Sequence, residues 1–245
     1  MRAEKRLISV NKREIGAMFD DIAPSYDFLN HFLSFGIDHY WRDKVIKKLK
    51  QHKALKTIDI ATGTADLAIL GAKKIKDSKI VGIDISDQML RKGRRKINKR
   101  KLNSRIALKW SDGHQIECPS NEFDAATIAF GLRNFENPVK GINEMHRVLK
   151  PGGVTIILEF STVKNRVFYK LFKFYFNKIL PLIGRLVSGN KKAYNYLPKS
   201  VVDFNRKYVI EKIMREAGFE NMYAKSLTFG VATMYCGTKK QNIAQ

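Results

Sequence analysis

The chain has 245 residues, and its 46 Lys and Arg against 23 Asp and Glu give a formal net charge of +23. A content of 44% hydrophobic and 11% aromatic residues excludes a disordered, charge-dominated chain, and the length fits one large domain or two small ones. Two cysteines, Cys118 and Cys236, exclude a disulfide framework and a cysteine-rich zinc site. The basic N-terminus has no apolar core long enough for a signal peptide. We therefore expect a folded, basic protein in the reducing cytoplasm.

The net charge has three interpretations: binding to nucleic acid, contact with an anionic membrane surface, or a general enrichment in lysine. Lysines make up 31 of the 46 cations and are scattered along the whole chain. A protein that binds nucleic acid normally gathers its cations on one face, so the scatter favours a general enrichment in lysine.

The centre of the chain alternates short apolar segments with amphipathic ones. The apolar segments are β-branched and bounded by turn residues, as buried parallel strands are, at 57–61, 79–85, 105–110, 123–130 and 153–160. Helical spacing of apolar residues follows at 66–74, 86–100 and 138–149, with Asp66, Ser86 and Asn137 as N-caps. This alternation predicts an α/β fold with a doubly wound sheet.

The segments on either side of this centre have different patterns. Residues 1–52 are expected to form an N-terminal helical extension before the core at 53–163, and residues 164–200 an aromatic and basic cap insertion. In the remainder, 201–245, a helix at 206–217 stops at Gly218, and strands at 222–229 and 231–240 lie close enough in sequence to pair antiparallel. We therefore predict a single domain over 1–245, built on a seven-stranded mixed sheet whose last strand is antiparallel.

The turn after the first strand, from Asp59 to Asp66, carries the clearest signal for a binding site. It has one glycine, Gly63, at the place where a ligand of a doubly wound sheet approaches the backbone. The G-x-G-x-x-G dinucleotide pattern is absent, and the two carboxylates favour a cationic or zwitterionic ligand. The structural alternatives are a helix cap for Asp66 and a loop hydrogen bond for Asp59.

The next two strands also end in carboxylates. Asp84 closes the second strand, where an acidic residue of a doubly wound sheet accepts the hydroxyls of a ribose. Asp112 and Gly113 follow the third strand and suit an adenine edge, although a plain turn is an alternative.

Together these features resemble the class I S-adenosylmethionine-dependent methyltransferases. Four further segments, FDDIAPSYD at 19–27, LSFGID at 33–38, FGLRN at 130–134 and LEFS at 158–161, are similar to the ubiquinone/menaquinone biosynthesis C-methyltransferase family. The resemblance implies a Rossmann-like fold, S-adenosyl-L-methionine as methyl donor, and a prenylated hydroquinone, commonly demethylmenaquinol, methylated on a ring carbon. It places cofactor contacts on Thr64, Asp84, Asp112 and Gly113.

Other candidate cofactor contacts are Gly63 and Asp59 in the first turn, and Tyr26, because the N-terminal extension is expected to fold over the cofactor. The chain also departs from the family. Ala129 stands where many members have a serine, so a hydroxyl contact to the cofactor should be missing, and Thr62 and Ala65 stand where glycine is common.

Methylation of a hydroquinone carbon requires the neighbouring hydroxyl to ionise. With a pKa of about 10, like the phenol of tyrosine, ionisation at pH 7 costs roughly 4 kcal/mol. Arg133, after the fourth strand, is expected to stabilise the phenolate, and Asn134 to hold a quinol oxygen. The alternative for Arg133 is a structural pairing with an acidic neighbour such as Glu136. No cluster of metal-ligand residues stands out in the sequence, and we expect no metal.

Residues 166–186 combine aromatic residues with lysines on a helical pattern that Pro181 should interrupt. The segment is too charged to span a bilayer, but a basic and aromatic helix can lie in its interface. We expect it to form a wall of the quinol pocket and to touch an anionic membrane at the inner face of the cell membrane. The alternative is a cap that packs on the sheet. A homo-oligomer is compatible with the sequence.

Two other functions compete with this interpretation. An RNA methyltransferase would suit the fold and the charge, but FGLRN stands where the motif D/N-P-P-Y/F would follow the fourth strand. A non-catalytic scaffold of a quinone-synthesis assembly would not need both Asp84 and Arg133. We therefore expect a quinol substrate and no specific nucleic-acid partner.

Overall fold

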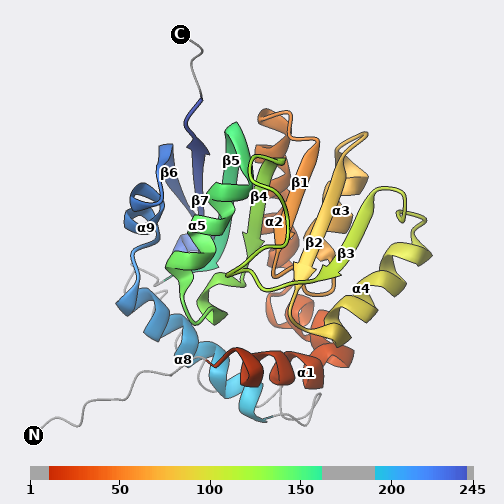
Figure 1. The fold of residues 1–245 in the computed structure, drawn as a ribbon. Helices are drawn as coiled ribbons and strands as arrows, with labels where there is room; N and C mark the ends of the chain where they lie inside the picture. The colour runs from red at the N-terminus through yellow and green to blue at the C-terminus, as the bar shows by residue number, and fades with distance from the viewer. Residues whose placement is uncertain (1–10, 162–190, 242–245) are drawn as a thin grey trace, which may run out of the picture.

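The computed structural model describes residues 11–161 and 191–241, and Figure 1 shows their arrangement. Two N-terminal helices, α1 (Lys12–Leu33) and α2 (Ile37–Gln51), precede an alternation of strands and helices. This alternation consists of β1 (Lys56–Ile60), α3 (Asp66–Lys74), β2 (Lys79–Asp84), α4 (Asp87–Lys99), β3 (Ile106–Trp110), β4 (Phe123–Ala129), the short helix η1 (Leu132–Asn134), α5 (Pro138–Val148) and β5 (Leu149–Phe160). The C-terminal part consists of α8 (Lys191–Lys207), α9 (Ile210–Glu216), β6 (Phe219–Leu227), η3 (Thr228–Gly230) and β7 (Ala232–Lys239).

The strands form one seven-stranded sheet in the order β3-β2-β1-β4-β5-β7-β6. Strands β1 to β5 run parallel, whereas β7 pairs antiparallel with both β5 and β6. The predicted mixed sheet with an antiparallel last strand is therefore confirmed. Because β1 to β5 are parallel, their carboxyl ends meet at one edge, the lower edge in Figure 1.

Apolar side chains from both faces of the sheet build the core. On one face, side chains of β1, β4 and β5 pack with α5, α9 and Phe204 of α8. On the other face, α2 and α3 pack on the sheet centre, and α3 and α4 on its β2 and β3 side. Phe123, Ala125, Ala126 and Ile128 of β4 are all buried, as expected for a central strand covered on both faces.

Two of the three predicted N-caps are confirmed. The Ser86 hydroxyl accepts a hydrogen bond from the Met89 N–H at 3.2 Å, and the Asn137 side chain accepts one from the Lys140 N–H at 3.1 Å. The prediction that Asp66 caps α3 is wrong, because the cap residue is Ala65, in the left-handed region at φ 66°. The carboxylate of Asp66 instead pairs with Lys96 of α4.

The single helix predicted at 206–217 is also wrong, because α8 ends at Lys207 and α9 begins at Ile210. Val209 between them is extended at φ −107° and ψ 101°. The break lets Phe204 of α8 and Ile213 of α9 enter the same core cluster from differently directed helices. Gly218, at φ 93°, ends α9 as predicted.

Helix α1 crosses the carboxyl edge of the sheet and is tied to α4 (Figure 1). The Ser86 hydroxyl donates a hydrogen bond to Asp20 at 2.6 Å, and Asp27 pairs with Lys96 at 3.1 Å. The predicted N-terminal extension is therefore helical and lies over the place where parallel sheets bind ligands. Of the predicted insertion at 164–200, residues up to 190 lie outside the described part, and so does the whole 166–186 segment. No helix among the described residues is long and apolar enough to cross a membrane.

Replacing Ser86 with Ala should destabilise α4 and loosen α1 together, because one hydroxyl caps the first and anchors the second. Loss of an N-cap costs about 1 kcal/mol, and loss of the hydrogen bond to Asp20 adds a similar amount. The control is Asn137→Ala, which removes a cap whose side chain bonds Lys140 of its own helix, α5. Hydrogen exchange should rise in α1 only for Ser86→Ala, and equal exchange in the two variants would contradict this role.

Candidate active site

Two adjoining cavities lie beneath α1 at the carboxyl edge of the sheet. Cavity 1 runs past the ends of β1, β2 and β3 and has about 700 Å³ of empty space, whereas cavity 2, with about 800 Å³, lies between α1, α2 and α8; both volumes include space open to solvent. Four residues line both: Phe19, Tyr26, Ala129 and Phe130. A ligand in one cavity would therefore contact the same wall as a ligand in the other.

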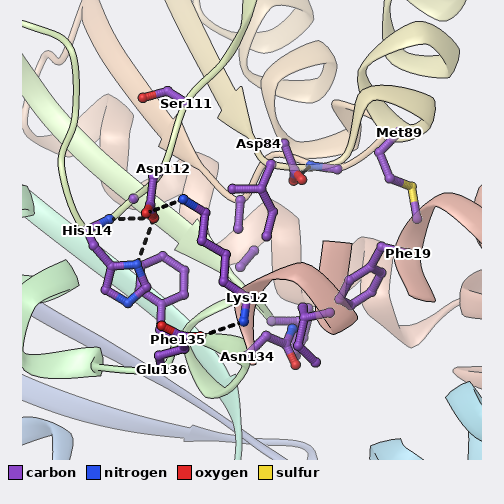
Figure 2. A pocket seen from close by; sticks show the side chains of 18 of the residues that line it. Lys12, Phe19, Asp84, Met89, Ser111, Asp112, His114, Asn134, Phe135 and Glu136 are labelled. Atoms are coloured by element: carbon purple, nitrogen blue, oxygen red, sulfur yellow. Dashed lines mark hydrogen bonds and ion pairs between the residues drawn. The ribbon is translucent and has the colours of Figure 1, made fainter. Parts of the chain in front are cut away.

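Asp84 occupies the predicted place at the end of β2 and lines cavity 1 (Figure 2). Its two carboxylate oxygens accept hydrogen bonds from the Gly63 N–H at 2.8 Å and the Ser86 N–H at 2.9 Å. Burial raises the pKa of Asp84, and these backbone donors oppose the rise. The two amides fix the carboxylate at the wall of the cavity, where a polyhydroxyl ligand can reach it.

Asp112 and Gly113 form another part of the wall of cavity 1. Burial alone would raise the pKa of Asp112, but hydrogen bonds from Lys12 and His114, each at 2.7 Å, lower it to about 2. Figure 2 shows Lys12 reaching from the start of α1 to this carboxylate. A Cβ on Gly113 would lie 2.5 Å from the Phe135 ring, so glycine is required for the ring to form this wall.

Ser111 provides an unpaired polar atom in cavity 1. Its hydroxyl is buried and has no hydrogen-bond partner among the described residues. Buried hydroxyls are normally paired, and Figure 2 shows this one directed away from the other labelled side chains of the cavity. The sequence drew attention to its neighbour Asp112 and gave no signal for Ser111 itself.

Two predicted cofactor contacts do not line cavity 1. The Thr64 hydroxyl donates to Asp27 and accepts from Lys96 at 3.0 Å, so it ties the first turn to α1 and α4. Asp59 lies one residue before the end of β1 and accepts hydrogen bonds from Thr62 at 2.6 Å and Thr127 at 2.7 Å. Its side chain therefore makes the loop hydrogen bond that we gave as the structural alternative to a cofactor contact.

Arg133 lines cavity 2. Its acidic partner is Glu159, not Glu136, which the structural alternative had named. Its Nη1 donates to Glu159 at 2.9 Å and to the carbonyl of Phe130, whereas Glu136 accepts the backbone N–H of Lys12 at 2.6 Å. Glu159 is fully buried, and the Nε of Arg133 is buried without a partner among the described residues. The ion pair therefore fixes the guanidinium through Nη1, and neither Nε nor Nη2 has an acceptor among the described residues.

Asn134 and Tyr196 link the two cavities. Asn134 lines cavity 1 and accepts a hydrogen bond at 3.1 Å from the hydroxyl of Tyr196, which lines cavity 2. Tyr26, predicted from its place in the extension, lines both cavities. Burial raises the pKa of Tyr26, while Asn30 and the charges of Arg133 and Arg42 oppose the rise. At neutral pH its phenol is therefore a neutral hydrogen-bonding group at the junction.

Sequence reasoning missed most of cavity 2. The rings of Trp41, Phe130 and Phe160 pack together with centroids 4.5 to 6.0 Å apart, and all three line this cavity. Their alignment depends on contacts between α2 and the ends of β4 and β5, which no local pattern reveals. Planar rings of this kind favour a flat aromatic ligand.

Folding also brings together three residues whose side chains could bind a metal ion, although the sequence led us to expect no metal. Ligand-type atoms of His31, Asp38 and His39 lie within 4.8 Å of one another. However, Asp38 is paired with Arg42, and a guanidinium at this carboxylate opposes a further cation. The geometry therefore favours an ion-pair network at this place over a metal centre.

Asp59→Asn should remove a pH dependence of stability. Burial raises the pKa of Asp59 from 3.8 to about 6, so its stabilising contribution is complete below about pH 4 and is lost as the pH rises through 6. The shift of about two units corresponds to roughly 3 kcal/mol. Chemical unfolding should show that, between about pH 4 and pH 8, the free energy of unfolding of the wild type falls by that amount relative to that of Asp59→Asn. If the wild type and the variant differ in free energy of unfolding by the same amount at both pH values, the raised pKa of Asp59 is contradicted.

Comparisons with known proteins agree with this geometry. The model of the ubiE/COQ5 methyltransferase family matches residues 7–239. A demethylmenaquinone methyltransferase of Bacteroides fragilis is 41% identical over 226 residues, covering 92% of each chain. A ubiquinone/menaquinone biosynthesis C-methyltransferase of a Geobacter species is 45% identical over 233 residues, 95% of this chain and 99% of the relative.

Solved structures show the same fold at low identity. The [4+2]-cyclase SpnF superposes with a TM-score of 0.69 at 16% identity, over 96% of this chain and 98% of its own. A possible histamine N-methyltransferase from Thermotoga maritima gives 0.63 at 16% identity, over 92% and 100%. These similarities confirm the Rossmann-like fold alone. The family match and the identity to curated relatives show that the chain belongs to the ubiE/COQ5 methyltransferase family.

Proposed function

We propose that this chain transfers a methyl group from S-adenosyl-L-methionine to a ring carbon of a prenylated hydroquinone, with demethylmenaquinol as its substrate. The observation that carries the proposal is the shared wall of the two cavities, because methyl transfer requires donor and acceptor in line and in contact. The name of the Bacteroides fragilis relative supports demethylmenaquinol as the substrate.

Cavity 1 suits the methyl donor. Asp84 would accept the ribose hydroxyls. Asp112 and Gly113 would lie at the adenine edge, and the amide of Gly63 holds Asp84 in place. When bound, S-adenosyl-L-methionine supplies an electrophilic methyl group on a sulfonium, and this chemistry needs no metal.

Cavity 2 suits the hydroquinone. The rings of Trp41, Phe130 and Phe160 form an apolar aromatic wall, and Phe130 also lines cavity 1. A ring that packs on this wall at Phe130 would bring its acceptor carbon to the junction of the two cavities. Such positioning supplies up to roughly 7–11 kcal/mol of the barrier.

Arg133 is the group that lowers the cost of ionising the hydroquinone. Its guanidinium lines cavity 2 and can bind the ring oxygen next to the acceptor carbon, and its charge stabilises the oxygen as a phenolate. Glu159 fixes the guanidinium through Nη1 and the backbone N–H of Arg133, so the cation is preorganised. Asn134, held by Tyr196, would contact the same oxygen from the side of cavity 1.

We also propose that the enzyme works at the inner surface of the cell membrane, where a prenylated substrate resides. The net charge of +23 supports attraction to anionic lipid. None of the observations favours an RNA methyltransferase or a scaffold, and we propose no nucleic-acid partner.

A methylation assay tests the function directly. Labelled S-adenosyl-L-methionine is supplied with demethylmenaquinol in anionic vesicles, with demethylmenaquinol in neutral vesicles, and with bulk RNA. We expect label in the quinol, faster with anionic vesicles, and none in RNA. Label in RNA but not in the quinol would overturn the function, and equal rates with both vesicles would overturn the membrane proposal.

Two substitutions should separate cofactor binding from turnover. Asp84→Asn is expected to weaken cofactor binding at least about tenfold, because it removes the charge that accepts the hydroxyls. Arg133→Ala should leave the cofactor Kd within about twofold and lower kcat by about 10² to 10³, as loss of a donor to a developing oxyanion does. Calorimetry and steady-state kinetics measure both. A similar loss of cofactor affinity in the two variants would remove Arg133 from the catalytic role.

A further inference from the structure

Cavity 2 contains a second buried guanidinium, that of Arg42. Arg42 comes from α2, whereas Arg133 comes from η1 after β4, and both line the same cavity. Each residue is less than one-tenth exposed. Burying two cations is costly unless each is paired and bonded, so their presence calls for an explanation.

Asp38 holds Arg42 in place. Its carboxylate accepts hydrogen bonds from Ser34 at 2.7 Å, from Arg42 Nη1, and, at 2.7 Å, from a ring nitrogen of His31 when that nitrogen is protonated. Burial alone would raise the pKa of Asp38, but Arg42, Ser34 and His31 lower it, so it remains an anion at neutral pH. Asp38 is therefore fully occupied by its partners and serves to position the guanidinium.

The donors of Arg42 are only partly used. A guanidinium has five N–H groups, and Asp38 is the only acceptor that the described residues give to Arg42, through Nη1. Nε and Nη2 therefore have no protein partner in the described part of the chain. Donors of a buried residue that lines a cavity are normally paired, so they fit an acceptor on the ligand.

Both guanidiniums line cavity 2, together with Tyr26. The charges of Arg133 and Arg42 each act on the hydroxyl of Tyr26, at the junction of the two cavities. Cavity 2 thus combines an aromatic wall with two cationic groups, each of which has unused N–H groups. A ligand with one oxygen would satisfy only one of them.

We propose that Arg42 binds the second ring oxygen of the substrate, para to the oxygen held by Arg133, and so makes the enzyme selective for 1,4-dihydroxyarenes. This inference rests on the proposed function and goes beyond it. Arg133 stabilises the oxygen that ionises, whereas Arg42 determines specificity and Asp38 is its positioning residue. An analogue without the second oxygen would leave the buried donors of Arg42 unpaired, which a polar pocket penalises strongly.

The test compares two substrates and three forms of the enzyme. The substrates are a short-chain demethylmenaquinol, kept reduced, and the matching 3-prenyl-1-naphthol, which keeps the hydroxyl beside the acceptor carbon and lacks the para hydroxyl. The enzymes are the wild type, Arg42→Met and Arg42→Lys, each checked for wild-type circular dichroism and cofactor Kd.

The wild type should prefer the hydroquinone by about 10²-fold in kcat/KM. Arg42→Met should lower kcat/KM for the hydroquinone by about 10- to 100-fold, mainly through KM, and change that for the naphthol by less than about twofold. Arg42→Lys keeps the charge beside Asp38 but loses the Nε and Nη2 donors, and it should lose most of the preference. If Arg42→Met fails to fold, the lysine variant decides.

An equal loss on both substrates in the Arg42 variants, or a wild type without preference, would overturn the inference. Failure of the proposed function has a different signature, namely a wild type that methylates neither substrate. In that event, calorimetric binding of the two compounds to the wild type and to Arg42→Lys still decides the inference. Tighter binding of the hydroquinone that the variant loses would support it, and equal binding would overturn it.

Discussion

The attachment of α1 across the carboxyl edge of the sheet is the interaction on which the rest of the site depends. Lys12 reaches Asp112 at one end of the helix, Asp20 accepts from Ser86 in the middle, and Asp27 pairs with Lys96. These contacts join α1 to α4 and to the loop after β3. Without them the strand ends would face solvent, and α1 would not cover either cavity. The helix thus converts an ordinary doubly wound sheet into two enclosed compartments.

The two compartments differ in the sign of their fixed charges. Asp84 and Asp112 lie on cavity 1 and are stabilised as anions by backbone amides, by Lys12 and by His114. Cavity 2 has the guanidiniums of Arg133 and Arg42, each held by a buried carboxylate. This separation fits a donor with positive charge and hydroxyl groups beside an acceptor that develops negative charge. It also explains why two buried ion pairs persist although burial makes each of them costly.

The parts of this arrangement that local sequence determines could be predicted. The five parallel strands follow from short β-branched segments between turns, and the caps at Ser86 and Asn137 follow from the residue before a helical pattern. The end of β2 places Asp84 at the ligand edge for the same reason.

Contacts between distant segments could not be predicted. Glu159 was part of a recognised motif, yet its pairing with Arg133 requires the end of β5 to lie beside η1 after β4, 26 residues away in the sequence. Asp59 was assigned to the ligand because it stands near the turn, but its side chain lies one residue short of the edge. Asp38 and Arg42 form a recognisable pair on one helix, although only the packing of α2 against α1 places them in a cavity.

The most direct test of the account is a structure of the enzyme with S-adenosylhomocysteine and a short-chain naphthohydroquinone bound together. We expect the nucleoside in cavity 1 with its ribose on Asp84, and the aromatic ring in cavity 2 against the side chains of Trp41 and Phe130, with an oxygen at the guanidinium of Arg133. The acceptor carbon should point at the sulfur at the junction of the two cavities, which Tyr26 and Ala129 line. A ring bound outside cavity 2, or a nucleoside bound away from Asp84, would contradict the division of the site into these two compartments.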